Sequence, residues 1–128
     1  MVSALRIIRL PSRSWSAAAL SRNLKASALI LAFHSQGQQI YWKYQDIQIP
    51  GAKELGEVFA KVSGYTLEDT PYASGFAGYK DWFILRFGKP GYTVEVGQGE
   101  NPLPLEQFPQ IYRDNLGILV TAALGRGV

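Results

Sequence analysis

The sequence predicts an α/β domain, a partial three-layer α/β/α arrangement built on a mixed sheet, and three observations indicate it. Residues 28–33 form an apolar run with the length and composition of a fully buried strand, of the kind found in the middle of a parallel sheet. Residues 92–96 alternate between apolar and polar side chains, which is typical of a strand packed on one face. Residues 52–62 place apolar side chains at helical spacing. The order β-β-α-loop-β-α then predicts helices layered on a sheet.

The first half of the chain divides at polar turns. A glycine-containing turn follows the first strand and leads into a second strand over Gln39–Tyr44, where Ile40 and Trp42 share one face. A Pro-Gly turn precedes the helix over Ala52–Val62. Gly64 stands where a C-terminal cap belongs, so we expect the helix to end there.

The second half begins with a segment that predicts a loop. In residues 65–78, Thr70-Pro71, Ala73-Ser74-Gly75 and Gly78 interrupt any regular element. Residues 79–87, which are apolar and aromatic, are predicted to open as a short helix. After the strand at 92–96 and a loop with two glycines and two prolines, a final helix is predicted from about residue 105 or 109 to Leu124, ended by Gly125. Its predicted core stripe consists of Phe108, Tyr112, Leu116, Leu119 and Ala123.

Composition bounds the class of protein. The 128 residues suffice for one domain with a sizeable core, and a hydrophobic content of 47% with 18% charged residues is typical of a globular chain. The absence of cysteine excludes disulfides, thiolate metal sites and cysteine nucleophiles. No apolar run is long enough to span a bilayer.

Charge separates a basic irregular leader, residues 1–26, from the α/β domain of residues 27–128. The leader carries five of the 13 Lys and Arg residues and no Asp or Glu, a net charge of +5, whereas the remainder has 8 basic and 10 acidic residues and a net charge of −2. A nucleic-acid partner is therefore not expected. The leader resembles a transit peptide in composition but has no secretory core, so the default expectation is a cytoplasmic protein. One hypothesis has the leader direct the protein to an acidic surface or organelle.

Three features carry possible chemistry. His34, the single histidine, ends the first strand; Glu95 lies on the later apolar strand; and an aromatic, glycine-rich loop over residues 72–79 lies between them. Each has a structural explanation: a core histidine with one hydrogen bond, a carboxylate on a wet edge strand, a connecting loop. Together they suggest a metal hydrolase, because zinc sites combine a neutral imidazole with a nearby carboxylate base.

The segments LAFHSQGQQIYW, YASGFAGYKDWF and GYTVEVGQGENPLP resemble the C-terminal half of the zinc metallocarboxypeptidase fold. Within it they resemble the bacterial γ-D-glutamyl-diaminopimelate endopeptidases, which cut peptidoglycan stem peptides. The resemblance extends over about residues 27–124 in the same element order. The His-Ser pair and the spacing from Asp81-Trp82 to Glu95 carry it.

The resemblance implies roles for individual residues. His34 corresponds to the third zinc ligand, and Glu95 to the general base that takes a proton from zinc-bound water and delivers it to the leaving amine. Ser35 would line the substrate side of the pocket, and Tyr72 would cover the substrate. Lys80 stands at the position that sets side-chain specificity, where a cation could meet the second carboxylate of diaminopimelate; the alternative is a solvated surface lysine.

The sequence departs from the family in its metal and substrate ligands. The His-x-x-Glu motif that supplies the first two zinc ligands is missing, as is the Asn-Arg pair that grips the substrate carboxylate. Zinc is the implied cofactor, but its site is incomplete in this chain, so we expect the chain alone to be inactive as a peptidase. The alternative is a non-catalytic remnant that serves as a binding or assembly module.

Incomplete coverage of the fold also predicts partners. Missing strands would leave an open sheet edge and uncovered apolar faces, so we expect self-association or a complementary chain. A completed site would take a peptidoglycan-derived peptide. If the leader supplies a substitute element, a compact monomer is the other outcome.

Overall fold

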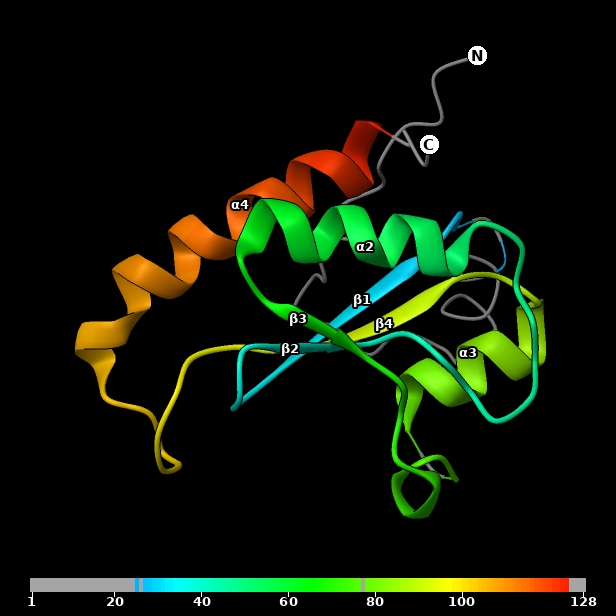
Figure 1. The fold of residues 1–128 in the computed structure, drawn as a ribbon, viewed down its shortest axis with the longest axis horizontal. Helices are drawn as coiled ribbons and strands as arrows, with labels where there is room; N and C mark the ends of the chain where they lie inside the picture. The colour runs from blue at the N-terminus through cyan, green and yellow to red at the C-terminus, as the bar shows by residue number, and fades with distance from the viewer. Residues whose placement is uncertain (1–24, 26, 77, 125–128) are drawn as a thin grey trace, which may run out of the picture.

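A computed structural model describes residue 25 and residues 27–76 and 78–124. These residues form a four-stranded mixed sheet with helices on both faces (Figure 1), which confirms the predicted α/β class. In chain order the elements are β1 (Ile30–His34), β2 (Gln39–Tyr41), α2 (Ala52–Ser63), β3 (Thr66–Glu68), α3 (Tyr79–Phe87), β4 (Gly91–Glu95) and α4 (Phe108–Leu124), with single 3₁₀ turns at Tyr72–Ser74 and Leu105–Gln107. The leader residues 1–24 and 26, and Gly125, lie outside the described residues.

The strands lie in the order β1-β4-β2-β3. β1 runs parallel to β4, β4 antiparallel to β2, and β2 parallel to β3. The expectation of a fully buried central strand at residues 28–33 is therefore wrong. Among the described residues β1 has a partner on one side only. Its side chains become more exposed along the strand, from the buried Ile30 to Phe33, which is 45% exposed. The two inner positions of the sheet belong to β4 and β2.

The main core lies between the sheet and the helices α2 and α4. Tyr92 of β4 is fully buried there; its ring meets that of Phe59 edge-on at 5.0 Å, and its hydroxyl donates to the Ala52 carbonyl oxygen at 2.7 Å. The α2 helix ends as predicted, because Gly64 adopts a φ of 77° and its N–H donates to the Ala60 carbonyl oxygen at 2.9 Å. The buried core residues are Ile40, Leu55, Phe59, Tyr65, Tyr92, Val94, Ile118 and Ala122.

The helix α3 packs on the opposite face, which makes the layers α/β/α (Figure 1). A small second core joins Phe83 of α3 to Ile30, with Phe87 packed against it. Since Ile30 is paired with Gly91, the first residue of β4, this contact lies at the start of β1 and β4. The opposite end of this sheet face, where β1 and β4 end at His34 and Glu95, is not covered by this contact.

The predicted core stripe of α4 is wrong. Phe108 is 65% exposed and Leu116 44% exposed, whereas the buried residues of α4 are Asn115, Ile118 and Ala122. Close helix packing explains the difference: a side chain at Gly117 would place its Cβ 2.9 Å from the Cβ of Val62 on α2. The helices therefore meet along the stripe around the glycine, and the larger apolar side chains are left outside.

Three smaller differences concern the loops and strands. The strand β3 lies inside the segment predicted as a loop; it pairs with β2 and turns Leu67 toward the core. The second strand stops at Tyr41 rather than Tyr44, which makes only an isolated bridge to Ile47. Residues 79–87 are helical throughout. None of the described helices has the length and apolar character that a membrane span requires.

Candidate functional site

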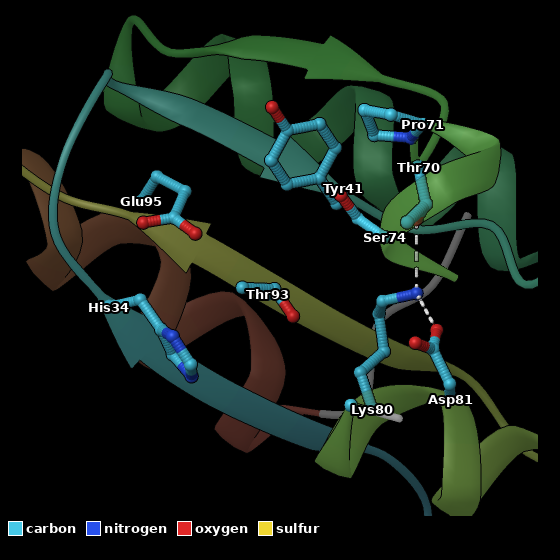
Figure 2. A pocket seen from close by; sticks show the side chains of 10 residues that line it. His34, Tyr41, Thr70, Pro71, Ser74, Lys80, Asp81, Thr93 and Glu95 are labelled. Atoms are coloured by element: carbon cyan, nitrogen blue, oxygen red, sulfur yellow. Dashed lines mark hydrogen bonds and ion pairs between the residues drawn. The ribbon is translucent and has the colours of Figure 1, made fainter. Parts of the chain in front are cut away.

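His34 and Glu95 are directly paired on neighbouring parallel strands. They are the last residues of β1 and β4 and are opposite one another in the register, so about 4.8 Å separates their strands. Alternation along β4 puts Tyr92 and Val94 in the core and turns Glu95 to the other face. Figure 2 shows both side chains on that face, at the edge of one pocket.

The segment that follows His34 crosses the end of β4. The Val96 N–H donates to the His34 carbonyl oxygen at 2.8 Å, and the Gly37 N–H donates to the Gly97 carbonyl oxygen at 2.9 Å. The Ser35 hydroxyl donates to Asn101 Oδ1 at 2.8 Å, and the amide of Asn101 donates back to the Ser35 carbonyl oxygen at 3.1 Å. Ser35 is thus bound to the loop after β4 and is not part of the pocket lining.

The pocket has a volume of about 320 Å³ and lies on the sheet face that α3 leaves open. It brings together three of the predicted site residues, His34, Lys80 and Glu95. Tyr72 stays outside the lining: it is 79% exposed and its ring packs edge-on against Phe76. The lining residues are His34, Tyr41, Thr70, Pro71, Ser74, Gly78, Lys80, Asp81, Thr93 and Glu95.

Lys80 is buried at the end of the pocket formed by α3, so the interpretation as a solvated surface lysine is wrong. Its ammonium donates to the Lys43 carbonyl oxygen at 2.7 Å and to Thr70 Oγ1 at 3.0 Å, and it forms an ion pair with the buried carboxylate of Asp81 (Figure 2). Burial lowers the pKa of Lys80, and the neighbouring Asp81 carboxylate opposes that shift.

Seven of the ten lining residues were not singled out as site residues from the sequence, among them Tyr41, Thr70, Asp81 and Thr93. For Thr93 a signal existed, because strand alternation places it on the same face as Glu95. Tyr41 follows from the register, in which it is opposite Thr93. Thr70 and Asp81 reach the pocket only through the packing of α3 and the loop before it, for which the local sequence has no signal.

Comparison with known proteins bears on this site. The chain is 47% identical over 100 residues to gamma-D-glutamyl-L-diamino acid endopeptidase 1 of Lysinibacillus sphaericus, a match that takes in 78% of this chain and 24% of that protein. The chain is similar to part of a gamma-D-glutamyl-L-diamino acid endopeptidase. It is also 41% identical over 90 residues to the uncharacterized protein YqgT of Bacillus subtilis (strain 168), covering 70% of this chain and 24% of YqgT.

The chain spans about a quarter of the length of these curated relatives. No protein-family model matches it. The similarity to the endopeptidase supports the resemblance drawn from the three sequence segments, at the level of that peptidase. The wider zinc carboxypeptidase assignment stays a prediction.

The described residues do not fit a zinc ion by themselves. Catalytic zinc sites in proteins have three protein ligands, and no group of three His, Cys, Asp or Glu side chains lies close enough to hold a metal in the part of the chain that the structure describes. His34 and Glu95 are a pair, and the carboxylate of Asp81 at the other end of the pocket pairs with Lys80 instead. A complete metal centre would need ligands from elsewhere.

Proposed function

We propose that this chain is the part of a peptidase that contributes the catalytic carboxylate, and that the peptidase hydrolyses γ-D-glutamyl-diaminopimelate bonds in peptidoglycan peptides. The observation that carries the proposal is the pairing of His34 with Glu95 at the mouth of one pocket, in a chain 47% identical to part of a gamma-D-glutamyl-L-diamino acid endopeptidase. The chain alone is inactive in this proposal, because the described residues supply only part of the site.

Glu95 is the proposed general base. Its carboxylate accepts a proton from the attacking water and returns it to the nitrogen of the leaving amine, which must leave as a neutral amine. The Glu95 side chain is partly exposed at the strand end, where water reaches it. His34 beside it is a proposed metal ligand, with the remaining ligands outside the described residues. Ser35 and Tyr72 are proposed to meet the substrate as it enters.

A reconstitution experiment tests the role of Glu95. The chain is mixed with the part of the Lysinibacillus sphaericus endopeptidase that it does not match, and release of diaminopimelate from a γ-D-glutamyl-diaminopimelate peptide is measured. We expect cleavage in the mixture, with Glu95→Gln reducing the rate by about 10²–10⁴-fold. Glu57→Gln, an exposed glutamate on α2, is the matched control and should leave the rate unchanged. Full activity of Glu95→Gln would refute the proposal.

Zinc titration tests the metal proposal separately. Calorimetry on the chain alone should show weak binding that His34→Ala hardly changes, because the described residues bring no three ligands together. In the reconstituted mixture we expect about one zinc per complex, lost in His34→Ala. Tight binding of one zinc by the chain alone, lost in that variant, would contradict the proposal that the chain alone holds only part of the metal site.

The second candidate is a non-catalytic binding or assembly module. The exposed apolar side chains of α4 favour it, because they form a surface that the described part of the fold does not cover. This candidate predicts that the mixture forms a complex, seen by analytical ultracentrifugation, but never releases diaminopimelate.

A further inference from the structure

Lys80, at the α3 end of the pocket, uses all its N–H groups in hydrogen bonds within the protein. A lysine ammonium has three N–H donors. Those of Lys80 serve the Lys43 carbonyl oxygen, Thr70 Oγ1 and Asp81 Oδ1. The Thr70 hydroxyl in turn donates to the same Lys43 carbonyl oxygen at 2.6 Å. Lys80 therefore has no donor left for a ligand, although it lines the pocket.

The Asp81 carboxylate has an oxygen to spare. Oδ1 accepts from Lys80, and among the described residues no hydrogen bond to Oδ2 is present. Oδ2 is also accessible: among the described residues, Asn115 Oδ1 is the one side-chain N or O atom that is fully buried and has no hydrogen bond. An ionised carboxylate accepts on both oxygens, so Asp81 offers a free acceptor to whatever fills the pocket.

A glycine keeps that oxygen uncovered. A Cβ at Gly78 would lie 2.9 Å from Asp81 Oδ2. Gly78 has φ −83° and ψ 154°, an extended conformation that any residue adopts, so the backbone does not require glycine there. Space beside the carboxylate is what the missing side chain provides, and Gly78 itself lines the pocket.

We propose that Asp81 binds the side-chain ammonium of the diamino acid residue of the substrate. This inference rests on the proposed function, since the relative is named for cleavage next to an L-diamino acid. A second amino group is what sets a diamino acid apart from other residues, and a charge-assisted hydrogen bond to a carboxylate is its matching contact. The pocket, at about 320 Å³, is at the lower end of the range for small-ligand sites. The residue proposed to contact the substrate side chain is thus Asp81, whereas the sequence had indicated Lys80. Lys80 instead holds the Asp81 carboxylate in place.

The test is a binding experiment, because it needs no turnover. The ¹⁵N-labelled chain is titrated with γ-D-glutamyl-L-lysine and with γ-D-glutamyl-L-norleucine, which has a methyl group in place of the aminomethyl end, and the dissociation constants are taken from the amide shifts of the pocket residues. We expect the lysine peptide to bind about 10-fold more tightly or better.

Gly78→Ala covers Oδ2 without removing the ion pair, so it should reduce the preference to near unity and leave norleucine-peptide binding unchanged. Asp81→Asn, which removes the carboxylate charge, should likewise reduce the preference for the lysine peptide to near unity. Gly75→Ala is the matched control on the same loop: its Cβ would lie 3.5 Å from the Tyr72 carbonyl oxygen, which is ordinary van der Waals contact, and the preference should persist. A preference that survives both Gly78→Ala and Asp81→Asn overturns this inference and leaves the proposed function intact. If neither peptide binds the pocket of the unmodified chain, the inference is also overturned, whereas the proposed function is decided separately by the reconstitution experiment.

Discussion

The packing of α4 gives the sharpest test of the fold. Ile118 is fully buried in the main core, so Ile118→Ala removes three carbons from a close-packed site and should cost about 2–5 kcal/mol of unfolding free energy. At this chain length that corresponds to a loss of roughly 4 °C in Tm per kcal/mol. Leu116, two residues earlier, is 44% exposed, so Leu116→Ala loses about 1 kcal/mol or less of transfer free energy.

Guanidinium unfolding followed by circular dichroism, at low micromolar protein, measures both variants side by side. The reasoning is refuted if Leu116→Ala costs as much as Ile118→Ala, because the stripe predicted from the sequence would then be the packed one. Repeating the measurement at higher protein concentration is the control for association. A cost at Leu116 that grows with concentration would show that another copy covers this surface.

Two further predictions concern ionisation and glycine. Burial raises the pKa of Tyr92, whereas tyrosine in the unfolded chain ionises near 10, so stability should fall as the pH rises above about 10, by up to about 1.4 kcal/mol per pH unit. Tyr92→Phe should lessen this slope and cost about 1 kcal/mol at neutral pH through the lost bond to Ala52; an unchanged slope in urea titrations at pH 8–11 would contradict it. Gly97→Ala should destabilise more than Gly64→Ala, although both have positive φ, because a Cβ at Gly97 meets Leu103 Cδ1 at 2.5 Å and one at Gly64 meets nothing within 4 Å; equal Tm losses would contradict this.

Elements set by local patterns were predictable from the sequence. The α2 helix has a regular apolar spacing and a left-handed glycine at its end, and β4 has strict alternation, so both lie where expected. The same alternation placed Glu95 away from the core. The resemblance implied that Glu95 and His34 belong to one site, but their pairing on neighbouring strands was not predicted, because a register between distant strands has no local signal.

Elements set by tertiary contact were not predictable. α4 has two apolar stripes, and periodicity cannot tell which one meets α2; the decision depends on Gly117 fitting against Val62. β3 is three residues long and forms because β2 offers an edge, not because its own composition favours a strand. The burial of Lys80 depends on acceptors contributed by Lys43 and Thr70, which lie far from it in the chain.

The position of β4 has a consequence for how the chain folds. β1 and β2 are joined by a short turn, yet they are not neighbours in the sheet, because β4 lies between them. Until β4 arrives from far along the chain, the two strands are free to zip together as a local hairpin, which loop-closure entropy favours. That hairpin must open before the native sheet can form. We therefore expect a slow folding phase that becomes faster when β1–β2 pairing is weakened. His34 and Glu95 come together only after this hairpin has opened.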